Sequence, residues 1–312
     1  MYTASGSGTL VGMAHLTDVP PAASARHRIG RTAGNLPPHV YFLVSAVLHY
    51  LGPSFAVLLF ARVAVLGVAW LRIASAALIL AAWRRPWRRW RELDGQAQRL
   101  LAAWGAVLAI MNACFYAAIS RLALGTVAAI EFLPVIVLAA IGVRSRRNLI
   151  ALALAVPGVF LLTDVRLAGA ALGFAFAFAN ALLVSLYIIL ADRVAKRRRL
   201  SGIDGQAASM LAAAVVITPV AGRQAVPAIA DPIALLAGIG VGVSSSVIPY
   251  VTDQLALARL PRATYATMVA LLPAIATVIG IVVLAQIPSA VELAGLALVV
   301  GGVALHRGRA GE

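Results

Sequence analysis

The sequence predicts an all-α integral membrane protein with ten transmembrane helices, arranged as two inverted repeats of five helices each. Three observations predict this fold class: the apolar composition, the regular spacing of apolar runs, and the placement of basic residues between them. Hydrophobic residues make up 62% of the 312 residues, and charged residues make up 12%. Soluble domains have about 45–50% apolar and about 25% charged residues. The composition therefore excludes a soluble enzyme.

Apolar runs follow one another along most of the chain, and each is close to the roughly 20 residues that cross a bilayer as a helix. Short loops separate the runs and leave no room for a second soluble domain. The expected spans are 40–60, 64–83, 100–120, 123–143, 148–164, 168–190, 206–221, 232–252, 263–285 and 289–305.

The regions outside these spans are two tails. Residues 1–38 are rich in Gly, Ala, Ser, Thr and Pro and lack the apolar core of a signal peptide, so we expect a disordered cytoplasmic N-terminal tail. Residues 307–312 form the expected cytoplasmic C-terminal tail. Between the tails, residues 39–164 are the first expected five-helix repeat and 165–306 the second.

The basic residues test this topology, because loops rich in Lys and Arg face the cytoplasm. With the N-terminus inside, most of the 26 Lys and Arg residues fall in cytoplasmic loops and tails. Four fall in outer loops (Arg62, Arg121, Arg166 and Arg223), and Arg72 lies inside a span. The distribution predicts that both termini are cytoplasmic. It also accounts for the net charge of +15 without a nucleic-acid partner.

Two pairs of segments suggest an internal repeat. Arg62-Val63-Ala64 matches Arg193-Val194-Ala195, and RLALGTVAAIEFLP at 121–134 matches RLPRATYATMVALLP at 259–273. Five helices are an odd number, so a second copy must be inverted in the membrane. Inverted repeats are typical of secondary transporters, whose binding site lies near the midplane between the halves.

Two ionisable residues lie well inside the expected spans: Arg72 in the second and Glu131 in the fourth. A charge at the centre of a membrane helix costs about 2.5–3.5 kcal/mol on insertion scales, which makes both functional candidates. Glu131 either couples transport to protons or contacts a substrate amino group. The alternative is a buried Arg72–Glu131 pair that fixes helix packing.

Other polar residues recur at helical spacing, where they either line a cavity or form hydrogen bonds between helices. They are Asn112 and Tyr116 in the third span, Asn180 and Tyr187 in the sixth, and Ser246, Tyr250 and Asp253 in the eighth. Asn112, Tyr116, Tyr250, Asn180 and Tyr187 join Arg72 and Glu131 as candidate substrate-binding or coupling residues.

Prolines and glycines mark places where helices bend or approach closely. Pro134 and Pro273 occupy related positions in the fourth and ninth spans, and each is either a hinge or a structural kink. Gly238-x-x-x-Gly242 permits close contact between helices of one chain, and a homodimer is left open.

The loop WRRPWRRWRELD at 83–94 combines Trp83, Trp87 and Trp90 with arginines. Tryptophan prefers the membrane–water interface and arginine binds anionic lipid, so we expect this segment to lie against membrane lipid. Nucleic-acid binding is disfavoured, because the segment is tied between two spans.

Motifs of other function classes are missing from the sequence. It has no HExxH metal motif, no GxxxxGK[ST] phosphate loop and no GxSxG nucleophile elbow, and Cys114 is its one cysteine. We therefore expect no metal, no cofactor and no enzymatic activity. A non-transporting membrane scaffold or sensor is a further alternative.

Three segments carry a family resemblance: GVAWLRIASAALILAAWRRPWR (67–88), MNACFYAAISRLALGTVAAIEFLP (111–134) and SSSVIPYVTDQLALARLPRATYATMVALLPAIATVIGIVVL (244–284). In these the chain resembles the EamA-type transporters of the drug/metabolite transporter superfamily, and most of all the bacterial threonine/homoserine exporters. The resemblance implies a secondary active transporter that exports amino acids or related small metabolites across the inner membrane by alternating access. A broad-specificity drug or metabolite carrier is the alternative.

The chain also departs from the family pattern in the ninth span. Leu272 stands where the family usually has a Glu before the proline, and Ala285-Gln286 stands where a Gly-Glu pair usually closes the helix.

Overall fold

The computed structural model describes residues 37–142, 146–164, 167–195, 202–257, 259–260 and 262–305. The expected tails fall almost wholly outside these residues. Within them, every regular element is a helix. The elements are α2 (Pro38–Leu59), α3 (Val65–Arg84), α4 (Pro86–Trp90), α5 (Gly95–Ile119), α6 (Leu124–Gly142), α7 (Arg146–Asp164), α8 (Leu167–Ala195), α9 (Gly202–Ala230), α10 (Pro232–Gly242), the π-helix η1 (Val243–Val247), α11 (Ile248–Leu257), α12 (Arg262–Val269), α13 (Leu272–Leu284) and α14 (Ala290–Leu305).

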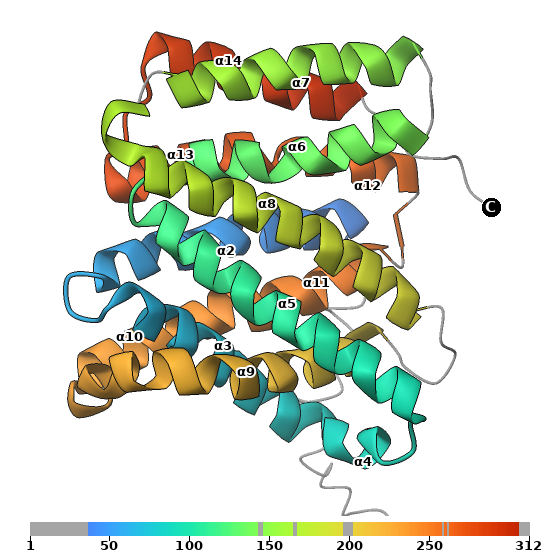
Figure 1. Ribbon diagram of the computed structural model, residues 1–312, viewed down its shortest axis with the longest axis vertical. Helices are drawn as coiled ribbons and strands as arrows, with labels where there is room; N and C mark the ends of the chain where they lie inside the picture. Colours follow the sequence, from blue (N-terminus) through green and yellow to red (C-terminus); the bar gives the residue numbers. More distant parts are fainter. Residues whose placement is uncertain are drawn as a thin grey trace, which may run out of the picture. The chain divides into compact units, whose positions relative to one another are not determined.

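The long helices lie side by side in layers, with α7 and α14 at one edge of the bundle and α3, α9 and α10 at the other (Figure 1). In the described part of the chain, six helical segments are long and apolar enough to cross a membrane: Pro38–Leu59, Val65–Arg84, Gly95–Ile119, Ala170–Val194, Ile203–Ala230 and Pro232–Asp253. Shorter apolar helices add Leu124–Pro134, Leu272–Leu284 and Ala290–Leu305. The protein is thus a multi-pass membrane protein. A helix or a run of helices lies at each of the ten expected ranges.

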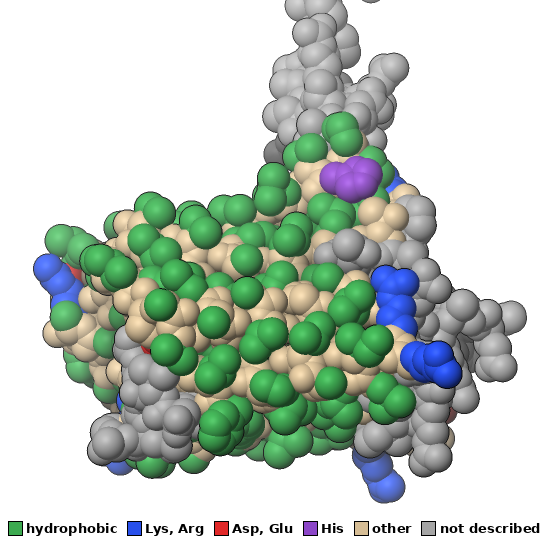
Figure 2. All heavy atoms as spheres, turned by 90° about the horizontal axis from the view of Figure 1, so that it is seen from above, with side chains coloured by type: hydrophobic (Ala, Val, Ile, Leu, Met, Phe, Trp, Pro, Cys, Tyr) green, Lys and Arg blue, Asp and Glu red, His purple; other side chains and the backbone are tan. Residues whose placement is uncertain are grey.

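The outer surface is apolar where a soluble protein would carry charge. On the face formed by α7 and α14, hydrophobic side chains cover the middle and basic side chains gather toward the ends (Figure 2). The exposed residues of these helices include Leu149, Ile150, Phe160 and Leu293. An apolar face of this extent would not be stable in water, so it is the face that lipid covers.

The helix α9 is longer than the sequence indicates. The expected span 206–221 ends near Pro219, yet α9 runs from Gly202 to Ala230 with Pro219 and Pro227 inside it. Membrane helices tolerate proline because neighbouring helices and hydroxyl groups satisfy the freed backbone carbonyls. Next to Pro219, Thr218 Oγ1 donates to Ala214 O at 2.6 Å, one residue before the Val215 carbonyl that Pro219 leaves without its backbone donor.

The eighth and ninth expected spans are not continuous α-helices. In the eighth, η1 separates α10 from α11. In the ninth, a turn at residues 270–271 separates α12 from α13, and Pro273 lies in the first turn of α13, where proline is well tolerated. Pro134 instead lies inside α6. The hinge role of both prolines stays a prediction.

Small residues let α7 and α14 pack closely. A Cβ atom on Gly158 would lie 2.7 Å from Gly295 O, and one on Gly302 would lie 2.7 Å from Ala151 O. Membrane helices associate through van der Waals packing of such small residues, because lipid provides no hydrophobic drive between them.

Polar caps define several helix ends. Asp94 accepts a hydrogen bond from Ala97 N at 2.6 Å at the start of α5. Asp231 accepts from Ile233 N at 2.9 Å and Ala234 N at 3.2 Å at the start of α10. The Ala234 backbone N–H and the Arg62 side chain hold the pKa of Asp231 below its usual value.

Ala285 ends α13 with a φ of 53°, in the left-handed region that favours glycine. We predict that Ala285→Gly stabilises the protein by about 1 kcal/mol, because it removes the Cβ clash of the left-handed conformation. Thermal unfolding of the purified protein in detergent measures the effect. The control Ala274→Gly, inside α13, should destabilise by about 1 kcal/mol. Equal changes in the unfolding temperature of the two variants would contradict the prediction.

Candidate functional site

The centre of the bundle holds a buried guanidinium. Arg72 lies midway along α3 and is 4% exposed. Its Nε donates to Ser246 Oγ at 3.0 Å, and its Nη2 donates to Ser245 O at 3.0 Å. Both acceptors belong to η1, where the helix widens and its backbone pairing changes. The π-helical turn therefore supplies acceptors for a charge that the membrane interior cannot solvate.

Two glycines of α10 bring this helix close enough to α3 for the hydrogen bonds between Arg72 and η1. A Cβ atom on Gly242 would lie 2.8 Å from Arg72 O and would overlap Ser75 Oγ, and one on Gly238 would lie 2.7 Å from Leu71 Cδ1. The Gly238-x-x-x-Gly242 motif thus packs α10 against α3 within one chain.

Tyr116 of α5 completes the surroundings of Arg72. The guanidinium carbon lies 5.6 Å from the centre of the Tyr116 ring, within range of a cation–π interaction. The Tyr116 hydroxyl is fully buried and lies beside the Arg72 and Ser245 side chains.

Glu131 of α6 lies in the same region but does not pair with Arg72. Its Oε2 accepts a hydrogen bond from Asn180 Nδ2 of α8 at 3.3 Å. Arg72 and Tyr50 lie within electrostatic range of the carboxylate. Both charged residues are described, and no ion pair within 4.0 Å joins them. The buried pair that the sequence left open is therefore not formed.

Three aromatic residues flank the two charges. Tyr250 of α11 lies within electrostatic range of both Arg72 and Glu131. His49 packs edge-on against Tyr50, with ring centres 5.2 Å apart, and lies within range of Arg72. His49 and Tyr50 are not among the site residues that the sequence predicts. The sequence signal that could have identified them is that His49 and Tyr50 form a polar pair inside the apolar span 40–60.

Two expected site residues bond elsewhere. Asn112 is buried, and its Nδ2 donates to Leu108 O of its own helix at 2.8 Å. The Tyr187 hydroxyl donates to Gln206 Oε1 of α9 at 2.8 Å, and its ring lies 5.4 Å from that of Trp104. The structure therefore gathers Arg72, Tyr116, Glu131, Asn180 and Tyr250, while Asn112 and Tyr187 bond to local partners. A binding role for each residue stays a prediction.

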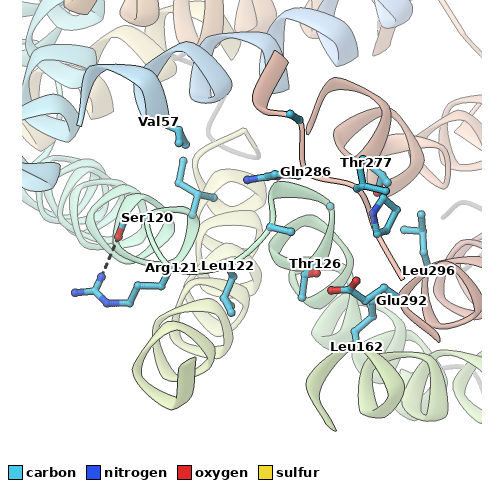
Figure 3. Close-up of a pocket in the computed structure, with 16 residues that line it drawn as sticks. Val57, Ser120, Arg121, Leu122, Thr126, Leu162, Thr277, Gln286, Glu292 and Leu296 are labelled. Carbon is cyan, nitrogen blue, oxygen red and sulfur yellow. Dashed lines mark hydrogen bonds between the residues drawn. The ribbon is translucent and has the colours of Figure 1, made fainter. Parts of the chain in front are cut away.

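A cavity of about 530 Å³ opens at one end of the bundle, among the ends of α5, α7 and α13 and the beginnings of α6 and α14 (Figure 3). Gln286 Oε1 accepts from Leu124 N at 3.0 Å and thereby caps α6. Thr126 and Glu292 line the cavity, and their side chains point toward one another in Figure 3. None of the seven expected binding or coupling residues lines it. Thr126 lies five residues before Glu131 on α6, about 7.5 Å along the helix axis.

Glu292, which is 4% exposed, is not among the site residues that the sequence predicts. Its Oε2 accepts from Ser289 N at 2.7 Å, and its own N donates to Ser289 Oγ at 3.2 Å. This is a capping box, and the spacing Ser289-x-x-Glu292 was a visible signal for it. Gln286 was visible only as a departure from the family pattern.

An apolar helical bundle that buries separate charges at its centre is the architecture of a membrane transporter. The EamA-like transporter family matches residues 171–307. The chain is 32% identical over 257 residues to the threonine/homoserine exporter RhtA of Salmonella typhimurium strain SL1344, covering 80% of this chain and 84% of the relative. It is 31% identical over 271 residues to RhtA of Escherichia coli K12, covering 84% of this chain and 88% of the relative. The chain belongs to the EamA-like transporter family.

A solved crystal structure shares the fold, with a TM-score of 0.50 and 19% identity over 86% of this chain and 96% of the other. The family and the two exporters support a membrane exporter of the drug/metabolite transporter type. They are transporters rather than enzymes, which fits the expectation of no enzymatic activity.

The contact between Gly242 and α3 makes a prediction about stability. Gly242→Ala should destabilise the protein by about 1–3 kcal/mol, because the added methyl group forces α10 away from Arg72 O and Ser75. Gly240→Ala is the matched control, since nothing lies within 4 Å of a Cβ atom at that position. Thermal unfolding in detergent compares the two. Equal stability of both variants would show that the close contact does not hold the helices together.

Proposed function

We propose that the protein exports threonine/homoserine-like amino acids or related small metabolites across the bacterial inner membrane, as a secondary active transporter. One observation carries the proposal: the buried centre holds a guanidinium and a carboxylate that do not neutralise each other. An amino acid is a zwitterion, so its carboxylate complements Arg72 and its ammonium group complements Glu131.

The bonding of each group leaves room for such a ligand. Arg72 has five N–H donors in a planar fork, and η1 uses two of them. Glu131 accepts from Asn180 through one oxygen, and within the described residues the other oxygen has no hydrogen bond. Charge-assisted hydrogen bonds to both groups would be the strong contacts of the complex.

The helix contacts support the two inverted repeats. Each helix of the first half has an expected counterpart in the second half. The counterparts are α2 and α8, α3 and α9, α5 and α10–α11, α6 and α12–α13, and α7 and α14. When each helix is replaced by its counterpart, the main pairs of neighbouring helices map onto other observed pairs or onto themselves. The pair α5–α8 becomes α11–α2, α5–α9 becomes α10–α3, and α6–α8 becomes α13–α2. The pairs α3–α9, α6–α13 and α7–α14 map onto themselves. A two-fold axis in the membrane plane produces this pattern.

The same arrangement suits alternating access. The bonds from Arg72 to η1 and from Asn180 to Glu131 each join the first half of the chain to the second. The 530 Å³ cavity opens at one end of the bundle, and the polar centre is buried below it. Rocking of one half against the other would expose the centre to each side in turn. The basic loops would place both termini in the cytoplasm.

A broad-specificity metabolite carrier is the second candidate. Leu272, which replaces the Glu expected from the family resemblance, packs among core apolar side chains and offers no charge to a substrate. Gln286 keeps a side-chain acceptor for Leu124 N but carries no charge.

We predict that Arg72→Gln lowers uptake of labelled threonine and homoserine into everted vesicles, and their efflux from loaded cells, about tenfold or more, because a charged hydrogen bond to the substrate carboxylate is lost. The matched control is Arg62→Gln, whose side chain is 57% exposed at the end of the bundle. The control should transport like the unchanged protein. Transport of neither amino acid by the unchanged protein would favour the broad-specificity carrier.

We also predict that Glu131→Gln removes the dependence of flux on an imposed pH gradient, because the amide cannot bind or release a proton. Everted vesicles with and without the gradient, at pH 5–8, make the measurement. Thermal unfolding checks that the variant is folded. A variant whose flux still follows the gradient would exclude Glu131 as the proton-coupling group.

A further inference from the structure

A second concave feature lies on the lipid-facing side of the bundle, apart from the polar centre. It is a groove of about 340 Å³ between α4, α5 and α9, lined by Pro86, Trp87, Trp90, Ala102, Ala212 and Val215 among others. Its lining is almost wholly apolar. Val215 is 68% exposed beside it, so the groove opens toward lipid and not toward the protein interior.

One end of the groove is strongly basic. Residues 84–99 contain six arginines and two acidic residues. Arg84 is already engaged, because its Nε donates to Asp204 Oδ1 at 2.6 Å. Arg88 and Arg99 are exposed, and in the part of the chain that the structure describes neither side chain makes a hydrogen bond or an ion pair. These two guanidinium groups remain available to an external anion.

Two exposed arginines stand on helices that line the groove. Arg99 stands three residues before Ala102 on α5, so both lie on the same face, with Arg99 one turn nearer the loop. Arg88 follows Trp87 on the five-residue helix α4, so its side chain leaves a different side of that helix from Trp87, which lines the groove. Tryptophan prefers the level of the lipid headgroups. We therefore expect the end of the groove at α4 to lie in the headgroup layer.

We propose that this groove binds one acyl chain of an anionic phospholipid, whose phosphate lies against Arg88 and Arg99. Charge complementarity selects this occupant, because exposed, unpaired arginines stand on α4 and α5, two of the helices that form an apolar surface open to the bilayer. The phosphate accepts hydrogen bonds from the arginines, and the chain covers Ala102, Ala212 and Val215. The lipid would thereby join α4 and the start of α5 to α9.

Native mass spectrometry of the full protein, released from detergent with added phosphatidylglycerol or phosphatidylcholine, tests the proposal. The unchanged protein should retain phosphatidylglycerol more tightly than phosphatidylcholine. The double variant Arg88→Gln/Arg99→Gln should bind phosphatidylglycerol about 30-fold more weakly, from the loss of two basic contacts near the lipid surface, and should bind phosphatidylcholine unchanged. Arg146→Gln, at an exposed arginine that does not border the groove, is the matched control and should behave like the unchanged protein.

A second variant tests the apolar part. Ala102 is exposed and lines the groove, so Ala102→Phe fills it without disturbing the core, and it should weaken the binding of both lipids. Thermal unfolding without added lipid shows that each variant is folded. Equal retention of the two lipids by the unchanged protein, or unchanged lipid retention in the double variant or in Ala102→Phe, would overturn the proposal. None of these measurements depends on transport.

Discussion

The hydrogen bonds of the buried Arg72 guanidinium are the constraint on which the centre of this protein depends. A charge at that depth must find acceptors inside the protein, and η1 supplies a hydroxyl and a backbone carbonyl. Those acceptors reach Arg72 only if α10 lies directly against α3, which Gly242 allows. The glycine and the π-helical turn are adjacent in the sequence and the arginine lies far from both, yet each would be costly without the other two. They form one structural unit that joins the two halves of the chain.

This unit also determines what the centre can bind. Because η1 holds Arg72 and Asn180 bonds Glu131, the two opposite charges stay near each other without forming an ion pair. A direct pair would satisfy both groups and leave little for a ligand to gain. Two charges that are hydrogen-bonded but not neutralised favour a ligand that carries both opposite charges. The hydroxyl of Tyr116 lies beside Arg72 and Ser245 and adds a third polar group that a ligand can contact.

The sequence predicted the helix ranges well because apolar length is a strong signal, and it predicted the two central charges because ionisable residues are rare in membrane spans. It did not predict the breaks at 243–247 and 270–271, since a π-helical turn differs from an α-helix by one residue in its bonding and has no composition of its own. It also ended the seventh span too early, at residue 221 shortly after Pro219, because in the structure tertiary packing outweighs the intrinsic cost of proline. The hydrogen-bond partners of Arg72 could not be predicted from the sequence for a similar reason. One of them is a backbone carbonyl, which every residue possesses.

The hydrogen bonds and ion pairs between helices indicate which helices can move relative to one another. The helix α3 is tied to α9 by Arg84–Asp204 at one end, and to η1 by Arg72 at its middle. At the opposite end, Arg62, in the loop before α3, bonds to Asp231 at the start of α10. With α3, α9 and α10 joined at three levels, we expect them to move as one body. Among the residues that the structure describes, no side-chain hydrogen bond or ion pair holds the break at 270–271, which lies two residues before Pro273, so a change of angle between α12 and α13 disrupts few hydrogen bonds. Pro134, inside α6, would have to bend a longer helix. Of the two expected hinges, the one at Pro273 is therefore the less costly to bend.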